Sequence, residues 1–383
     1  MIRQKENNLV LVLDIGTEAV KGLLLNKKKE ETELFCSGLT YFDKYRSFET
    51  EKIEQEILEK AISNLLSGFG LKEEKERKEV FLLFGLAPDI LKSRILSLSL
   101  KRKKIKTIDK SEEKEIFKRV LDKTKKEISR EISQELGILP SDFSFLRLKF
   151  LEIKIEGYRV PCLRGYEGEN LEFRILGIFY LKNGFEKIER VVDNFGFKEK
   201  EVFSSVEGLI CCLRKEKPDG LFIDVGGEVS QIFFVKKGIL KRVKGLRFGG
   251  SFFSHILGER LGLTDLDARI LKERYANREL SLDSQERIKE IFSQEIWFEE
   301  FFDKIKTKIP GILLSRNIFL FGGGALLPEI KEYLRKEDRK AKITVILPGQ
   351  LNILPKGAKI SKNPQYTNNC LIYKAFLNKK MKK

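Results

Sequence analysis

The sequence contains a single histidine, His255, in 383 residues. One histidine excludes metal sites built from several imidazole ligands and argues against a Ser-His-Asp triad, so we interpret it as structural. Cysteine is also scarce, and no two cysteines have the CxxC spacing of zinc or redox motifs. We therefore expect reduced thiols in a cytoplasmic protein at the five cysteine positions, Cys36, Cys162, Cys211, Cys212 and Cys370.

Long hydrophobic runs are absent as well. No apolar stretch approaches the length of about 18 residues that a membrane-spanning helix requires, so none is expected. The first residues, MIRQKENNLVLVLDIG, lack a signal-peptide cleavage site and predict a strand. Hydrophobic residues nevertheless make up 42% of the chain, which is enough for the cores of two or more domains.

The formal net charge is +17, a sign that suits nucleic acid or anionic lipid. Lysine and glutamate alternate in stretches such as KEEKERKE, which is typical of a solvated helix face. The densest basic run, residues 101–106, contains no aromatic residue for base stacking, and no zinc-finger or RNA-recognition motif accompanies it. We expect no nucleic-acid partner, while attraction to an anionic membrane surface remains open.

A unit of strand, Asp-x-Gly turn, strand, strand and helix occurs twice, near residue 9 and near residue 220. Between the two units lie a basic alternating segment, a charged helix expected at 111–136, and a second alternating segment that ends near residue 175. This interruption predicts an inserted subdomain, with the strand EFRILGIFY at 172–180 as the return to the first domain.

The pattern predicts an α/β protein with two duplicated domains. We expect this division: 1–91 as the first part of the first domain, 92–168 as the inserted subdomain, 169–215 as the rest of the first domain, 216–350 as the second domain with a helical subdomain at about 255–312, and 351–383 as a return to the first domain with a basic tail.

Three glycine-rich turns follow predicted strands: DIGT from Asp14, DVGG from Asp224 and FGGGA from Phe321. Glycine lets backbone N–H groups approach phosphate oxygens, because no Cβ blocks the approach. An aspartate at the end of a strand can hold a hydrated Mg²⁺, so two facing Asp-Gly turns can clamp one nucleotide while the third holds its other end. A Walker loop is absent. Any one of these turns is better explained as a structural turn, whereas the three together, in this order and spacing, favour a nucleotide site.

The order of these turns resembles the phosphate-1, phosphate-2 and adenosine motifs of the actin, Hsp70 and sugar-kinase superfamily. The resemblance implies an actin-like two-domain fold of duplicated βββαβα units that binds ATP and Mg²⁺. Asp14 and Asp224 would hold Mg²⁺ through water, and Lys272 would contact the nucleoside. The implied nucleotide-binding residues are Asp14, Gly16, Thr17, Lys21, Asp224, Gly226, Gly227, Ser230, Gly249, Gly250, Lys272, Gly322, Gly323, Gly324 and Ala325.

Two segments resemble the bacterial cell-division protein family FtsA. They are VPCLRGYEGENLEFRI at 160–175, similar to the end of the FtsA small subdomain, and NPQYTNNCLIYKAFL at 363–377, similar to the closing FtsA helix. The resemblance covers nearly the whole chain. It implies a scaffold that binds ATP, polymerises into protofilaments, and links the tubulin-like FtsZ and other division proteins to the inner face of the cell membrane.

Several residues depart from the family pattern. Glu228 brings negative charge to the second phosphate turn, where unscreened repulsion costs roughly 1–4 kcal/mol, unless it points away or helps to bind Mg²⁺. Val229 lacks a hydroxyl donor, and Arg269 stands where the family has glutamate. We therefore expect weak or absent ATPase activity. Glu207 falls near the helix that positions the attacking water in relatives, and is a weak candidate for that role. We interpret it first as an ordinary polar helix residue.

Other members of the superfamily remain open alternatives. FtsA proteins end in an amphipathic membrane helix, whereas the closing helix here is followed by the basic residues 378–383, which we expect to be a solvated end. This feature favours PilM, the actin-like adaptor of type IV pilus assembly. A sugar or acetate kinase would need a general base between the domains, and no such constellation is visible.

Overall fold

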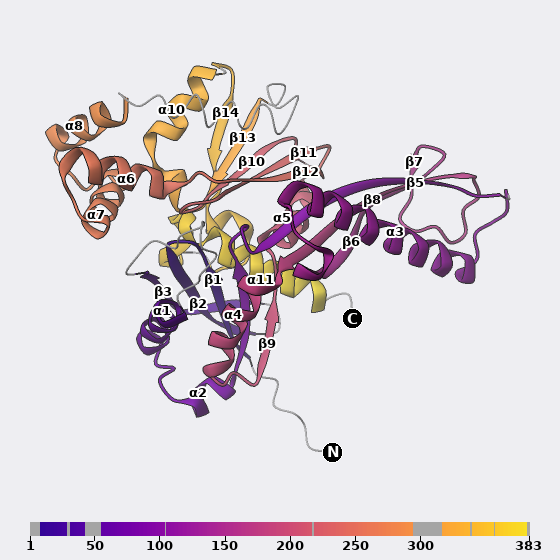
Figure 1. Cartoon of the computed structure of the whole chain (residues 1–383), viewed down its shortest axis with the longest axis horizontal. Coiled ribbons are helices and arrows are strands. Elements are labelled where there is room, and N and C mark those ends of the chain that lie inside the picture. The colour runs from indigo at the N-terminus through magenta and orange to yellow at the C-terminus, as the bar shows by residue number, and fades with distance from the viewer. Residues whose placement is uncertain are drawn as a thin grey trace.

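The computed structural model describes residues 8–28, 31–42, 55–103, 105–216, 218–293, 316–337, 339–355 and 357–380. Within these ranges the chain forms two five-stranded sheets and one four-stranded sheet. Figure 1 shows the two five-stranded sheets in one body and the four-stranded sheet projecting from it.

The first sheet has the strand order β3-β2-β1-β4-β9. Its central strand β1 carries an uninterrupted apolar run, and alternate residues face opposite layers: Leu11 and Leu13 pack in one core, and Val10 and Val12 in another. Helices cover both faces, which explains why residues 9–13 of the strand are all apolar. The strands are β1 (Leu9–Ile15), β2 (Ala19–Lys27), β3 (Thr32–Tyr41), β4 (Val80–Leu86) and β9 (Glu199–Val202), and the helices are α1 (Gln55–Gly68), α2 (Glu74–Lys78), α4 (Lys182–Asn194), α5 (Ser205–Glu216) and α11 (Thr367–Lys380).

The second sheet repeats this arrangement in the order β12-β11-β10-β13-β14. Its central strand pairs antiparallel with the next strand of the meander and parallel with β13, as β1 does with β2 and β4. The predicted duplication is therefore confirmed. The elements are β10 (Gly220–Val225), β11 (Ser230–Lys236), β12 (Ile239–Leu246), α6 (Gly250–Leu261), α7 (Asp265–Ala276), α8 (Leu282–Ser293), β13 (Asn317–Phe321), α10 (Pro328–Glu337) and β14 (Lys342–Val345).

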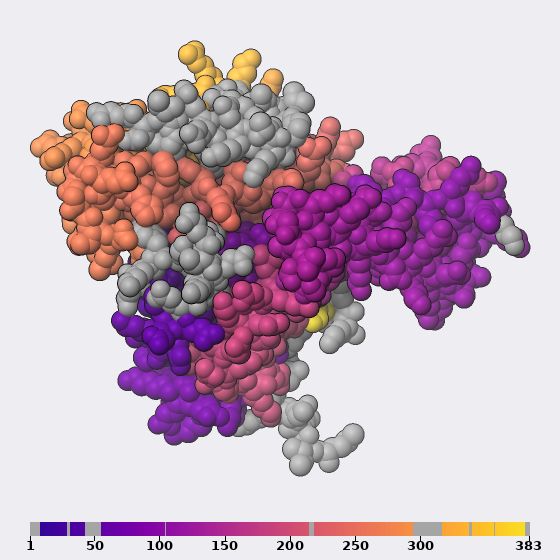
Figure 2. Space-filling view, viewed as in Figure 1, coloured from indigo at the N-terminus to yellow at the C-terminus, as the bar shows by residue number. Residues whose placement is uncertain are grey.

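The third sheet, in the order β5-β8-β6-β7, forms with helix α3 an arm that extends from the body (Figure 2). Helix α3 begins after the cap Asp109, whose carboxylate accepts from two backbone N–H groups, and ends at the left-handed Gly137. Its buried residues are spaced every four positions and pack on the sheet. The elements are β5 (Leu91–Lys101), α3 (Lys110–Leu136), β6 (Phe143–Ile155), β7 (Tyr158–Arg159) and β8 (Asn170–Leu181).

Two expectations need correction. The strand at 172–180 was expected to return to the first domain, and it does so only in part. β8 pairs along its length with β5 and β6, and Phe173 and Ile175 share the core under α3. Its residues Leu176 and Ile178 pack in the core of the first sheet. Residues Asn378–Lys380 continue helix α11 and do not follow it.

The helical region expected at about 255–312 is described as α6, α7 and α8 up to residue 293, and residues 294–312 lie outside the described residues. In the part of the chain that the structure describes, no helix combines the length and the apolarity needed to cross a membrane. Short 3₁₀ turns complete the fold: Pro140–Asp142, Gly323–Leu326, Pro348–Leu351, Lys359–Lys362 and Pro364–Tyr366.

Candidate functional site

Asp14 and Asp224 occupy equivalent places in the two halves and line one cleft. Each lies near the end of the central strand of its sheet, β1 or β10, just before a glycine turn. Lys21 lies opposite Asp14 in the β1–β2 pair, and its Nζ is 2.7 Å from Asp14 Oδ2. The duplicated fold thus brings the two sequence-predicted aspartates to a shared site.

The charges in the cleft influence one another strongly. Burial raises the pKa of Asp224 to about 7, against a lowering effect of the hydrogen bond from Asn368 Nδ2 at 2.8 Å and of the nearby Lys21. Burial alone would lower the pKa of Lys21, but Asp14 and then Asp224 raise it above its usual value. Lys21 therefore stays charged between the two aspartates.

The two Asp-Gly turns touch each other directly. The backbone N–H of Glu228 donates to Thr17 Oγ1 at 2.9 Å. A Cβ at Gly227 would lie 2.8 Å from Thr17 Oγ1, and a Cβ at Gly249 would lie 2.1 Å from the Gly227 carbonyl oxygen. Glycine is required at 227 and 249 because the turns approach this closely.

The third glycine turn forms another wall of the cleft. Gly322 has a φ of 86°, and a Cβ there would lie 2.4 Å from Asp224 Oδ1. Only glycine at this position leaves room for the Asp224 carboxylate. At Gly323 the nearest atom to a Cβ is Gln365 Cγ at 3.6 Å, and both residues line the cleft. Space in front of Gly323 is therefore open to a ligand.

Helix α7 carries charged side chains from the second half to the first. Arg269 is buried, donates from Nη1 to the Phe42 carbonyl at 3.1 Å, and lies 5.0 Å from the centre of the Tyr41 ring. The Tyr41 hydroxyl in turn donates to Glu273. Lys272 Nζ donates to the Gly250 carbonyl at 3.1 Å. The contacts of Arg269 and Glu273 join the two halves at one end of the cleft.

Solved structures with the same arrangement are known. The PilM–PilN type IV pilus biogenesis complex contains a chain that matches with a TM-score of 0.64 at 15% identity, over 96% of this chain and 98% of that one. The protein described here therefore has an actin-like ATPase fold. No protein-family model matches the sequence, and a search of curated proteins found no match.

Two further structures match with lower scores. MreB 5 of Spiroplasma citri bound to AMPPNP has a TM-score of 0.49 at 10% identity, over 98% of this chain and 99% of that one. The ethanolamine utilization protein EutJ from Carboxydothermus hydrogenoformans has a TM-score of 0.46 at 11% identity, over 94% and 88%. The predicted actin-like fold is confirmed, whereas membership of the FtsA family stays a prediction.

Most of the predicted nucleotide-binding residues line this actin-like cleft. Four do not line it but shape it from behind. Ser230, for example, donates from Oγ to the Phe248 carbonyl at 2.6 Å. The lining residues among those predicted are Asp14, Gly16, Thr17, Lys21, Asp224, Gly226, Gly227, Gly250, Lys272, Gly323 and Gly324, and the four behind are Ser230, Gly249, Gly322 and Ala325.

Several polar residues of the cleft were not predicted. Asn277 and Gln365 come from segments that carry no glycine motif, although each lies close in sequence to a predicted site residue or segment. Glu18 follows Thr17 in the first turn, and Glu273 follows Lys272 in α7, so adjacency to a motif residue was the available signal. The polar residues missed are Glu18, Tyr41, Ser204, Ser205, Gln231, Glu273, Asn277, Gln365 and Asn368.

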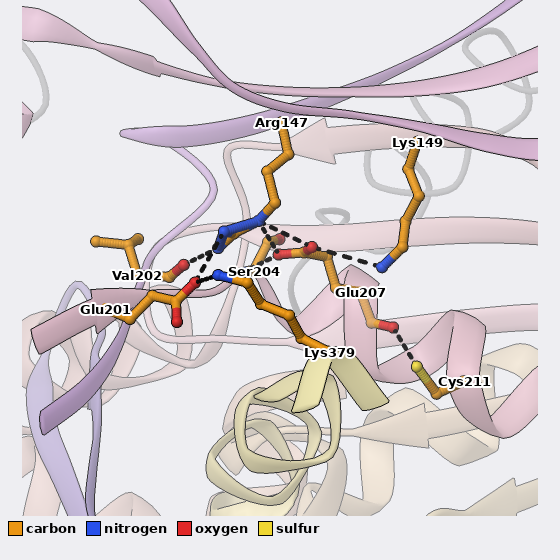
Figure 3. A network of polar contacts seen from close by, with 8 residues as sticks. All are labelled: Arg147, Lys149, Glu201, Val202, Ser204, Glu207, Cys211 and Lys379. Carbon is orange, nitrogen blue, oxygen red and sulfur yellow. Dashed lines mark hydrogen bonds and ion pairs between the residues drawn. The ribbon is translucent and has the colours of Figure 1, made fainter. Parts of the chain in front are cut away.

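Glu207, the candidate for positioning water, does not line the cleft, which corrects that expectation. Its side chain is 1% exposed and its Oε1 accepts from Arg147 Nε at 3.1 Å, with Lys149 Nζ at 3.6 Å (Figure 3). Its Oε2 accepts from the backbone N–H of Ser204 at 3.2 Å, which is half of a capping box for α5. Glu207 therefore joins the arm to the body, and the S-x-x-E pattern at 204–207 was the signal for this role.

The side chains of the cleft could bind Mg²⁺ that enters together with a phosphate ligand, but they do not form a complete metal site on their own. Asp224 Oδ1 and Asn368 Oδ1 are buried acceptors without a hydrogen-bond partner among the described residues. Carboxylate and amide oxygens suit this cation. Across the same residues no three acidic, cysteine or histidine side chains form a metal cluster. A cation here would need further oxygens, such as water and phosphate.

Proposed function

We propose that this chain is a nucleotide-binding adaptor of the PilM kind, which holds a partner protein and does not turn over a metabolite. The observation that carries the proposal is the likeness to a chain of the PilM–PilN complex, which extends over 96% of this chain and therefore includes the projecting arm as well as the two halves of the cleft. A metabolic kinase of this fold would need a general base beside its substrate, and Glu207 is held elsewhere.

The proposed ligand is an adenine nucleotide with Mg²⁺. Asp14 and Asp224 would hold the hydrated cation, which would neutralise phosphate charge. Lys21 would contact phosphate, because it stays charged between the aspartates. Lys272, Glu273 and the open surface at Gly323 would hold the nucleoside end. Hydrolysis would be slow, so that the nucleotide acts mainly by setting how the two halves are joined.

Binding of the nucleotide would be transmitted through α7, because this helix contacts both the cleft and the first half. Arg269 and Glu273 contact the end of β3 and the residue that follows it, while Lys272 reaches the first turn of α6. A change in the cleft would thereby alter the angle between the halves. Because β12 contacts β5, it would also alter the position of the arm relative to the second sheet. A partner protein bound at the arm would sense the nucleotide state.

The second candidate is the FtsA role, in which the chain would polymerise and link FtsZ to the membrane periphery. It is favoured by the sequence of residues 160–175, which resembles the end of the FtsA small subdomain. That segment leads into β8, the strand at the middle of the arm sheet. Both candidates assign the arm to protein contacts, so the partner decides between them.

The deciding experiment measures partner binding by the purified chain with Mg²⁺ and either ADP or ATP. Titration with a PilN-type protein and with FtsZ from the same genome, followed by fluorescence anisotropy, should show saturable binding of the former alone. Saturable binding of FtsZ, together with ATP-dependent filaments on lipid monolayers in electron micrographs, would reverse the assignment. Binding of neither partner in either nucleotide state would count against both roles.

A further inference from the structure

Glu18 lies between the two Asp-Gly turns, at the place where the proposed site would clamp the end of a phosphate chain. Its side chain is 9% exposed. A Cβ at Gly227 would lie 2.5 Å from Glu18 Cγ and 2.9 Å from its Cδ, so the glutamate side chain covers the second turn directly. The space above Gly227 is therefore filled by the chain itself.

The backbone holds Glu18 in this position. The Phe42 N–H donates to the Glu18 carbonyl at 2.9 Å, which ties the first turn to the residue after β3. On the other side, the Glu228 N–H donates to Thr17 Oγ1 at 2.9 Å. A group inserted between the two turns at this point would have to displace the Glu18 side chain and break the bond between Thr17 and Glu228.

The carboxylate of Glu18 also acts as an anion inside the cleft. Its Oε2 lies 3.8 Å from Lys272 Nζ, and both side chains are largely buried. Its Oε1 has no hydrogen-bond partner among the described residues. Burial raises the pKa of Glu273, and the hydrogen bond from Tyr41 and the charge of Lys272 lower it. The charge of Glu18 is a smaller effect that raises it. Glu18 therefore forms an ion pair with Lys272 across the two halves of the cleft.

The balance of charge in the cleft reinforces this effect. The acidic residues that line it are Asp14, Glu18, Asp224 and Glu273, against the two lysines Lys21 and Lys272. Lys21 is engaged by Asp14 at 2.7 Å. Without Glu18 the cleft would have one acidic side chain fewer, and Lys272 would lose its ion pair. Each further phosphate on a ligand adds negative charge to a cleft in which both lysines already lie beside carboxylates.

We propose that Glu18 makes this cleft selective for a nucleoside diphosphate over the corresponding triphosphate. Its carboxylate takes the place of the terminal phosphate between the two turns, so the ligand that fits is shorter by one phosphate. This inference rests on the proposed nucleotide site and adds the class of nucleotide that the site accepts. The resting form of the chain is then the diphosphate-bound one, with the turns in contact.

The test is isothermal titration calorimetry of the full chain in Mg²⁺ with ADP and with AMPPNP, which is not hydrolysed during the titration. The wild-type chain should bind ADP at least about tenfold more tightly than AMPPNP. Glu18→Gly removes the side chain and should abolish or reverse the preference. Glu18→Gln keeps the size and removes the charge, so it should reduce the preference by a smaller factor.

Glu33→Gln is the matched control, because it removes an exposed carboxylate of β3 that does not line the cleft and leaves Glu18 in place. It should retain the preference for ADP. An equal loss of preference in Glu33→Gln and Glu18→Gln would overturn the assignment to Glu18. Tighter binding of AMPPNP than of ADP by the wild-type chain would overturn the inference while leaving the nucleotide site intact. Failure of the wild type and of all three variants to bind either nucleotide would overturn the site itself.

Discussion

Asp14 and Asp224 face one cleft from equivalent strands of the two halves, and Lys21 between them is influenced by both carboxylates. This relationship follows from the duplication, since each aspartate lies near the end of the central strand that runs beside its meander. Two turns of the same design then meet at a pseudo-symmetric site.

Filling the open surface at Gly323 should abolish nucleotide binding without unfolding the chain. Gly323→Arg would project a long side chain into the cleft, because no atom comes closer than 3.6 Å to the position of its Cβ. We expect the affinity for ADP in Mg²⁺ to fall at least about 100-fold in calorimetry. Gly68→Arg is the control, since Gly68 has no neighbouring atom within 4 Å and lies away from the cleft. Unchanged affinity in Gly323→Arg would remove the third turn from the site.

The stability of the nucleotide-free chain should fall as the pH rises from about 4 to about 7. Burial raises the pKa of Asp224 to about 7 in the folded chain, from an ordinary value of 3.8, so the folded state binds the extra proton in this window. Its contribution to the free energy of unfolding is therefore complete below the lower value and is lost toward the higher one, at about 1.4 kcal/mol per pH unit or less. Asp224→Asn should remove this part of the slope. Denaturant unfolding in EDTA at several pH values measures it, and equal slopes in the two proteins would contradict the assignment.

Local pattern was enough to predict the parts of the fold that are set within short segments. The two meanders, the aspartates at their turns and the charged helix α3 all follow from periodicity and glycine placement. The position of β8 does not, because its partners β5 and β6 come from separate segments and pairing depends on which faces share a core. The strand was recognised correctly, while its sheet was not.

Most of the cleft was also predictable from local sequence patterns. Motif residues such as Asp14 and Gly323 lie in it because their backbone conformation is local. Glu18 was missed because the direction of its side chain depends on Gly227, more than two hundred residues away. Glu207 was misplaced because family resemblance identifies a helix but not the face on which a residue lies. Its capping pattern with Ser204 was the better guide.

Replacing Glu207 should weaken the joint between the arm and the body but leave nucleotide affinity unchanged. Glu207→Gln removes a buried anion from Arg147 and Lys149 and keeps only part of the hydrogen bonding, so we expect a loss of about 1–3 kcal/mol in unfolding free energy. Glu189→Gln, which affects a partly exposed pair with Lys200, is the matched control and should cost about 0.5 kcal/mol or less. A selective loss of nucleotide turnover in Glu207→Gln, with stability preserved, would restore the catalytic interpretation.

The contact between the two turns can be tested by steric rescue. Gly227→Ala would place a Cβ 2.5 Å from Glu18 Cγ, so we expect it to lower the free energy of unfolding by about 1–3 kcal/mol. The double variant Gly227→Ala with Glu18→Gly removes that clash and leaves only the contact with Thr17 Oγ1, so it should recover part of the loss. Denaturant unfolding of the four proteins in a double-mutant cycle measures the coupling, which should exceed the error of about 0.5 kcal/mol expected for independent sites. Gly245→Ala, where no atom lies within 4 Å, serves as the control for alanine in a strand. Additive effects would mean that Glu18 does not cover Gly227, and the closed arrangement of the two turns would then be wrong.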